Sequence, residues 1–134
     1  MKDNLFSLVT LLRALNIHYQ VSHHNTKGVT FFGDHEFLGG AYEEVVGDYD
    51  SLAERFVCEF GDEDISKLID GISTYNKYVN KNNIFKSFSL FEKEVQDQIE
   101  KIAKEKISQG LYNLLGSIAE KSESRYYKIE QRIK

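Results

Sequence analysis

The segment FFGDHEFLGGAYEEVVGDYDSLAERF, residues 31–56, decides the fold and also holds the residues that raise the question of function. The chain contains no proline, which removes the commonest helix breaker and favours long helices. We expect one helix to begin near Thr30 or Asp34 and to end near Phe60. Gly61 supplies the stop, as glycine does just beyond many helices.

Within this segment His35 and Glu36 begin like the motif of a zinc protease helix. That motif needs a second histidine four residues further on, one turn along the same face of the helix. The chain has Gly39 at that position. A zinc protease of this type is therefore excluded, and His35 needs another explanation.

Helical patterns also account for the sequence on either side. A first helix is expected to begin at Asp3 or Asn4, both suitable N-caps, and to end before the loop NTKG at 25–28. A shorter helix, broken near Gly71, is expected within residues 62–79. It lies between the second and third long helices.

Two further long helices follow the loop NKNN at 80–83, with Gly110 as the punctuation between them. Their apolar residues recur at helical spacing. These residues are Ile84, Phe88, Phe91, Val95, Ile99 and Ile102 in one helix, and Leu111, Leu114, Leu115, Ile118, Tyr126, Ile129 and Ile133 in the other. The sequence thus predicts an all-α fold, a four-helix bundle with one long crossover that carries a short helix.

The composition is that of one globular domain, residues 1–134, with 41% hydrophobic and 28% charged residues. The net charge of −4 argues against electrostatic binding of nucleic acid. The single cysteine, Cys58, excludes an intrachain disulfide, and we expect it to be a small core residue. No apolar run approaches the roughly 20 residues of a membrane span, and the N-terminus lacks the layout of a signal peptide. We expect a cytoplasmic protein with no membrane partner.

Four residues form a candidate metal site. Asp50 and Glu54 are one helical turn apart, so both carboxylates project from one face. His35 lies fifteen residues earlier, more than about 20 Å along the helix axis, and cannot share a metal with them in one chain. Two copies of the helix packed antiparallel about a two-fold axis would bring His35 of one chain to the carboxylates of the other, with His23 completing the site. Small residues near the midpoint would allow this close approach: Gly39, Gly40, Ala41 and Gly47.

Spacing alone leaves two interpretations open. A lone histidine and a pair of carboxylates one turn apart are also what an ordinary solvated helix face contains. The bundle-core alternative, with Glu-x-x-His motifs inside one chain, is excluded because no histidine has a glutamate three residues before it.

Residues 23–55 resemble the Dps family, the mini-ferritins of the ferritin-like superfamily, which assemble twelve subunits into a hollow shell. That family has a histidine, a histidine twelve residues on, an aspartate four later, an aspartate eleven later and a glutamate four later, usually followed by arginine. The residues at these spacings are His23, His35, Asp50, Glu54 and Arg55, with a glycine in place of the first aspartate. The FF and HE pairs also match, and the rest of the chain is compatible in helix order and length.

The resemblance implies a ferritin-like bundle with a ferroxidase centre shared between chains at a two-fold interface. His23 and His35 of one subunit would bind iron together with Asp50 and Glu54 of its neighbour, and these four would be the catalytic residues. The implied activity is oxidation of Fe(II), preferentially by hydrogen peroxide, with storage of ferric iron in a homododecamer. Zinc or manganese could also occupy such a site.

Three features depart from the family pattern. Gly39 stands where the family has a ligating aspartate, so the second metal position should bind more weakly, with His24, Glu36 or Glu43 as auxiliary ligands. His24 replaces an aromatic residue, and its ring is as readily explained by packing or exposure as by a ligand role. The stretch ISQGLYN, residues 107–113, is uncharged where many members have acidic residues lining an iron-entry pore. Iron entry should be slower or use another route.

DNA binding, another property of this family, is weakly supported, because the first helix begins almost at once and leaves no Lys-rich arm. The last helix carries four basic residues on one stripe, and glutamates among them favour a solvated, locally paired face. These basic residues are Lys121, Arg125, Lys128 and Arg132. The alternative function is a shell whose ferroxidase centre is impaired at Gly39, with a structural or DNA-associated role. A third possible function is that of a dimeric helical interaction module that forms no shell.

Overall fold

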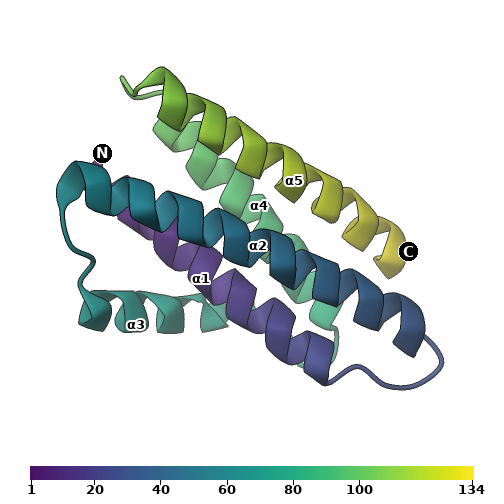
Figure 1. Ribbon diagram of the computed structural model, residues 1–134. Helices are drawn as coiled ribbons and strands as arrows, with labels where there is room; N and C mark the ends of the chain where they lie inside the picture. The colour runs from purple at the N-terminus through teal and green to yellow at the C-terminus, as the bar shows by residue number, and fades with distance from the viewer.

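The computed structural model describes all residues, 1–134, and contains only helices and the loops between them (Figure 1). Four long helices are accompanied by one short helix and a 3₁₀ turn. Their bounds are Lys2–His24 (α1), Phe31–Phe60 (α2), Ile65–Thr74 (α3), Tyr75–Tyr78 (η1), Ile84–Ala103 (α4) and Gln109–Ile133 (α5). The predicted all-α class is confirmed, and no helix is both long and apolar enough to span a membrane.

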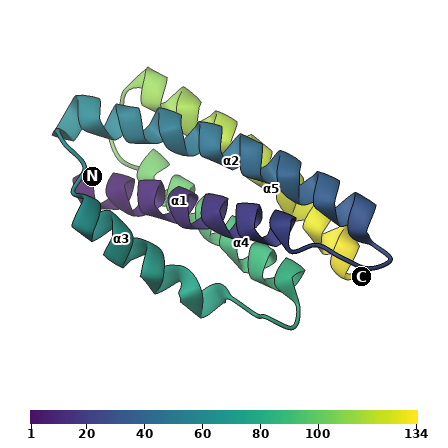
Figure 2. The same ribbon diagram turned by 60° about the horizontal axis from the view of Figure 1, so that its bottom comes forward.

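Helices α1 and α2 form one antiparallel hairpin, and α4 and α5 form a second that packs beside it (Figures 1 and 2). Because α2 and α4 run in the same direction, a long connection must return the chain along the bundle. This connection carries α3 and η1, and α3 lies along the side of α1 (Figure 2). The chain therefore has a long crossover with a short helix where the sequence predicts one.

Both ends of α2 lie where the sequence predicts them. Thr30 is the N-cap, and Gly61 is the C-cap, with its N–H donating to the carbonyl oxygen of Val57 at 2.9 Å. Gly61 has a φ of 89°, in the left-handed region that glycine adopts without steric cost. The helix between them is uninterrupted despite its internal glycines.

The start of α1 differs from the prediction. Met1 is the N-cap, since the N–H of Leu5 donates to the Met1 carbonyl oxygen at 2.9 Å. Asp3 and Asn4, expected as caps, lie inside the first turn instead. A carboxylate in the first turn interacts favourably with the helix dipole, so Asp3 stabilises the same helix end without capping it.

Two other expectations are wrong. Gly110 does not separate the third and fourth long helices, because α4 ends at Ala103 and Gly110 lies in the first turn of α5. The Ser108 side chain caps α5 by accepting a hydrogen bond from the N–H of Leu111 at 3.1 Å. Cys58 is exposed rather than buried, because it lies off the face of α2 that packs into the core.

Gly71 also does not break the short helix, which continues to Thr74. Gly71 instead lies at the contact between α3 and α1. A Cβ atom at this position would lie 2.5 Å from Cγ2 of Thr10, a buried residue of α1. Only a residue without a side chain lets the two helices approach this closely.

We expect Gly71→Ala to lower the free energy of unfolding by about 1–3 kcal/mol, because the added methyl group overpacks the contact with Thr10. Gly116→Ala is the matched control, since nothing lies within 4 Å of a Cβ at this position on α5. That change should be neutral or stabilise by up to about 1 kcal/mol, as alanine does in a helix. Urea denaturation of both variants measures the difference; equal effects would show that Gly71 is not a contact point.

The core lies between the two hairpins, and α1 contributes the largest share of it. The fully buried apolar residues of α1 are Leu5, Leu8, Val9, Leu11, Leu12, Ala14, Leu15 and Tyr19. They form one buried cluster with most residues of the predicted stripes of α4 and α5, although Ile84 lies at the start of its helix and is exposed.

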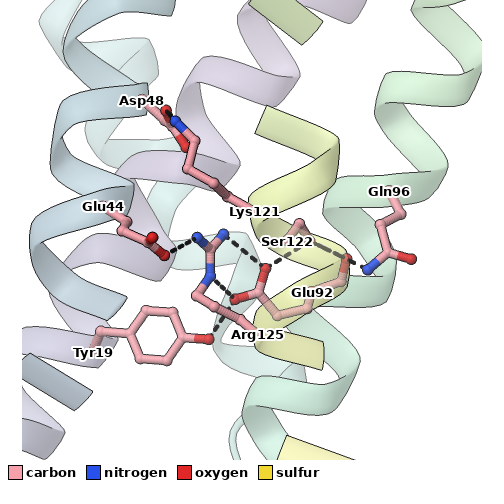
Figure 3. A network of polar contacts seen from close by, with 8 residues as sticks. All are labelled: Tyr19, Glu44, Asp48, Glu92, Gln96, Lys121, Ser122 and Arg125. Carbon is pink, nitrogen blue, oxygen red and sulfur yellow. Dashed lines mark hydrogen bonds and ion pairs between the residues drawn. The ribbon is translucent and has the colours of Figure 1, made fainter. Parts of the chain in front are cut away.

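A polar network crosses this core and joins all four long helices (Figure 3). Glu92 is fully buried and accepts hydrogen bonds from Tyr19, from Ser122 and, through both carboxylate oxygens, from Arg125 at 2.7 and 3.1 Å. Arg125 also donates to Glu44 on α2 at 3.1 Å. Burial, together with the charge of Glu92, raises the pKa of Tyr19 well above its usual value. Every polar atom of Glu92 is thus satisfied, as a buried carboxylate requires.

The four basic residues expected on a solvated face of α5 form one only in part, since Lys128 and Arg132 are exposed. Arg125 is only 3% exposed and belongs to the core network. Lys121 pairs with the buried Asp48 at 2.6 Å, and Arg132 makes two hydrogen bonds to Asp34 at 3.1 Å. These partners lie on α2, so the stripe fastens α5 to the first hairpin.

Candidate metal centre

The structure brings His23 and His35 together at the end of the first hairpin. α1 ends at His24, and residues 25–30 reverse the chain, with Gly28 at a φ of 89° in the left-handed region. The imidazole rings of His23 and His35 stack with centroids 3.8 Å apart and planes inclined by 22°. The ring of Phe31 also stacks on the ring of His35, with centroids 4.8 Å apart.

Each histidine is hydrogen-bonded to the backbone of the other. Nδ1 of His23 lies 2.8 Å from the carbonyl oxygen of His35, and Nδ1 of His35 lies 3.1 Å from that of His23. A carbonyl oxygen only accepts hydrogen bonds, so both Nδ1 atoms carry the hydrogen and donate it. In the neutral rings the lone pair is then on Nε2, the arrangement that metal-binding histidines usually adopt.

Gly39 explains why His23 has room in this arrangement. A Cβ atom at position 39 would lie 2.8 Å from Cε1 and 3.0 Å from Nδ1 of His23. The imidazole ring therefore packs directly against the glycine backbone. Gly39, which the sequence presents as a missing ligand, makes the space for a histidine ring, and an aspartate there would force His23 to move.

We expect Gly39→Ala to separate the two imidazole rings while leaving the fold intact, because His23 is only half-buried and its ring can swing outward. Gly33→Ala, also on α2, is the control, since nothing lies within 4 Å of a Cβ there. Proton NMR of the histidine rings should show loss of the ring contact in the first variant only. Preserved ring contacts in Gly39→Ala would contradict the assignment of this glycine.

Asp50 and Glu54 lie on the second half of α2, and both are exposed and make no ion pair within the chain. No group of three or more histidine, cysteine or carboxylate side chains within one chain is placed to hold a metal. The chain therefore presents two half-sets of candidate ligands: the histidine pair, where α1 meets the start of α2, and the carboxylate pair, on the second half of α2.

The three auxiliary candidates do not complete either half-set. His24 is exposed, and its ring is inclined by 51° to that of His23 at 5.9 Å. Glu36 is exposed in a groove between α2 and α5 that Gly40 and Arg125 also line. Glu43 is exposed on α2.

Sequence patterns did not identify Thr26, which contacts both His23 and His35. Its hydroxyl donates to the carbonyl oxygen of His23 at 3.0 Å and lies 3.1 Å from Nδ1 of His35. The segment NTKG indicates only that a helix stops, so nothing in the sequence distinguishes this threonine from any other loop residue.

Comparison with protein-family models, with curated proteins and with solved structures gives no significant match to this chain. The assignment of function therefore depends on the residues and the geometry described above.

Proposed function

We propose that this chain is a Dps-like mini-ferritin, a ferritin-like four-helix bundle that oxidises Fe(II) at sites shared between two subunits and stores ferric iron inside a dodecameric shell. In each site His23 and His35 come from one subunit, and Asp50 and Glu54 from its neighbour. The observation that carries the proposal is the stacked histidine pair, which is prepared to bind metal but lacks a third ligand in its own chain.

The donor set fits Fe(II). Both Nδ1 atoms are engaged by backbone carbonyl oxygens, which leaves one free Nε2 on each ring. The exposed carboxylates of Asp50 and Glu54 have no cationic partner in the chain and add hard oxygen ligands of opposite charge to iron. Imidazole nitrogen combined with carboxylate oxygen is a set that iron binds well.

Antiparallel packing of two α2 helices about a two-fold axis would join the half-sets. Gly40 and Gly47 face open space, with nothing within 4 Å of an added Cβ, so another helix could approach their backbone closely.

The chemistry follows from these ligands. The carboxylates stabilise Fe(III) more than Fe(II), because the higher charge interacts more strongly with them, and so they favour loss of an electron. Two Fe(II) ions supply the two electrons that reduce one hydrogen peroxide, with two protons, to two waters. Because peroxide takes both electrons at one centre, hydroxyl radicals do not form, and iron storage and oxidant protection are the same reaction.

The alternative is a shell in which this chemistry is impaired, and the absence of a carboxylate at Gly39 favours it. Against it, the glycine makes room for the His23 ring instead of leaving an empty position. DNA is not included in the proposal, because three of the four basic residues of α5 are buried or paired with α2. A cytoplasmic location remains part of the proposal.

Anaerobic loading with Fe(II), then peroxide, followed by a sizing column, tests the proposal. Twelve chains of 15.5 kDa make a particle of about 186 kDa. Ferric iron should elute with protein at that mass. A particle of that mass from which iron precipitates at the rate of a protein-free control would support the impaired shell, and a dimer would exclude both.

A further inference from the structure

Thr26 closes a ring of hydrogen bonds around the histidine pair. The carbonyl oxygen of His23 is among the last four of α1, which have no partner within the helix. Thr26 Oγ1 donates to this oxygen at 3.0 Å, and Nδ1 of His35 donates to it at 3.1 Å. The free carbonyl oxygen of His23 at the end of α1 thereby orients the ring of His35, twelve residues later.

The threonine adds a second acceptor for the Nδ1 hydrogen of His35, beside the His23 carbonyl oxygen. A hydroxyl has a single hydrogen, and Thr26 uses it toward the His23 carbonyl oxygen. Toward Nδ1 of His35, at 3.1 Å, the same oxygen must act as an acceptor. Both neighbours of this Nδ1 are therefore acceptors, and the neutral ring has its hydrogen on Nδ1 and its lone pair on Nε2.

Packing fixes the planes of the two rings. The His23 ring contacts Gly39 and stacks on the His35 ring, and the His35 ring also stacks with Phe31. The hydrogen bonds fix rotation within these planes. Both rings are thus oriented within one chain, before any partner supplies its carboxylates.

We propose that Thr26 is a positioning residue of the proposed metal centre, whose hydroxyl acts together with the His23 carbonyl oxygen to hold His35 in the form with Nε2 free to bind metal. This proposal rests on the proposed function for its purpose, although the hydrogen bonds themselves exist in the metal-free chain. Gly39 acts with Thr26, because it leaves space for the ring of His23, which donates a hydrogen bond to the carbonyl oxygen of His35. Removal of the hydroxyl leaves the ligands in place but loosens their orientation.

The test compares Thr26→Val, which keeps the shape but loses the hydroxyl, with Thr26→Ser, which keeps the hydroxyl. ¹⁵N NMR of the metal-free, assembled protein at alkaline pH, where imidazole is neutral, reports which ring nitrogen carries the hydrogen. Wild type and Thr26→Ser should show His35 with hydrogen on Nδ1. Thr26→Val keeps only the His23 carbonyl oxygen as an acceptor, and this oxygen is no longer held by the hydroxyl, so its preference for hydrogen on Nδ1 should be weaker and a fraction of the other form should appear. Co(II) binding, followed by its absorption, should weaken about 10–100-fold in Thr26→Val, as for other partners that orient a metal ligand.

The two readouts separate this proposal from the function on which it rests. An unchanged tautomer and unchanged Co(II) affinity in Thr26→Val would overturn the positioning role. If wild type binds no Co(II) but the tautomer changes in Thr26→Val only, the positioning role is supported and the iron-binding function is overturned. Equal losses in the serine and valine variants would assign the effect to packing and also overturn the role of the hydroxyl.

Discussion

Glu92→Leu should lower the free energy of unfolding by about 3–5 kcal/mol, the usual cost of breaking a buried ion pair by removing one partner. Arg125 would remain buried at 3% exposure with only Glu44 as its counter-charge. The hydroxyls of Tyr19 and Ser122 would also lose their shared acceptor. Urea denaturation, with the midpoint and slope fitted together, measures this loss.

The double variant Glu92→Leu, Arg125→Met separates the missing partner from the missing packing. Replacement of a whole buried ion pair by apolar residues of similar size is often neutral or stabilising, so the double variant should recover most of the loss. The coupling between the two positions would then exceed the additivity expected of independent sites. A double variant as unstable as the sum of both single changes would show that the pair is not a unit.

Glu54→Gln should remove iron oxidation above the protein-free rate while the fold and assembly stay unchanged. Glutamine keeps the shape but loses the charge that binds Fe(II), and loss of a direct ligand should weaken iron binding by about 100-fold or more, because even an indirect partner costs 10–100-fold. Since Glu54 is exposed and unpaired within the chain, stability should change by less than about 0.5 kcal/mol.

The matched control for this prediction is Glu59→Gln, another exposed glutamate of α2 that no part of the proposed site uses. Peroxide-dependent oxidation of Fe(II), followed by absorbance, should be normal in this control. Normal oxidation in Glu54→Gln as well would show that the site is assigned to the wrong residues.

The helices were predictable because their signals are local. Thr30 and Gly61 delimit α2 by their own backbone preferences, and the apolar stripes of α4 and α5 need only helical periodicity. The role of Gly71 was not predictable, because a glycine within a helix looks like a break until its neighbour is known. Its contact with Thr10 joins residues 61 positions apart, and no local pattern reports it.

The core network shows a different limit. Ser122 and Arg125 lie at helical spacing between the buried residues Ile118 and Ile129 of α5. Their spacing therefore predicted burial, whereas their polarity predicted exposure. The partner that makes burial of Arg125 acceptable, Glu92, lies on another helix. Chemistry alone could not choose between the two interpretations.

The candidate site was predictable in part. Residue spacing identified the two half-sets and showed that one chain cannot combine the carboxylates with His35. Residue spacing could not show that the His23 ring packs on Gly39, or that Thr26 contacts both His23 and His35. These contacts depend on the conformation of the loop between α1 and α2. Gly39 looked like the position of a lost ligand, but it makes room for the ring of His23, one of the proposed ligands.

Intersubunit sharing of the site is tested most directly by co-assembly of two differently tagged variants, one carrying Glu54→Gln and the other His23→Gln. Each variant alone should oxidise iron no faster than the protein-free control. In a mixed dimer one site receives both substitutions and the other receives neither, so random assembly should restore about a quarter of the sites. Mixed particles purified through both tags should therefore regain about a quarter of wild-type activity. Mixed particles without any recovery would show that the histidines and carboxylates of different subunits do not form one centre.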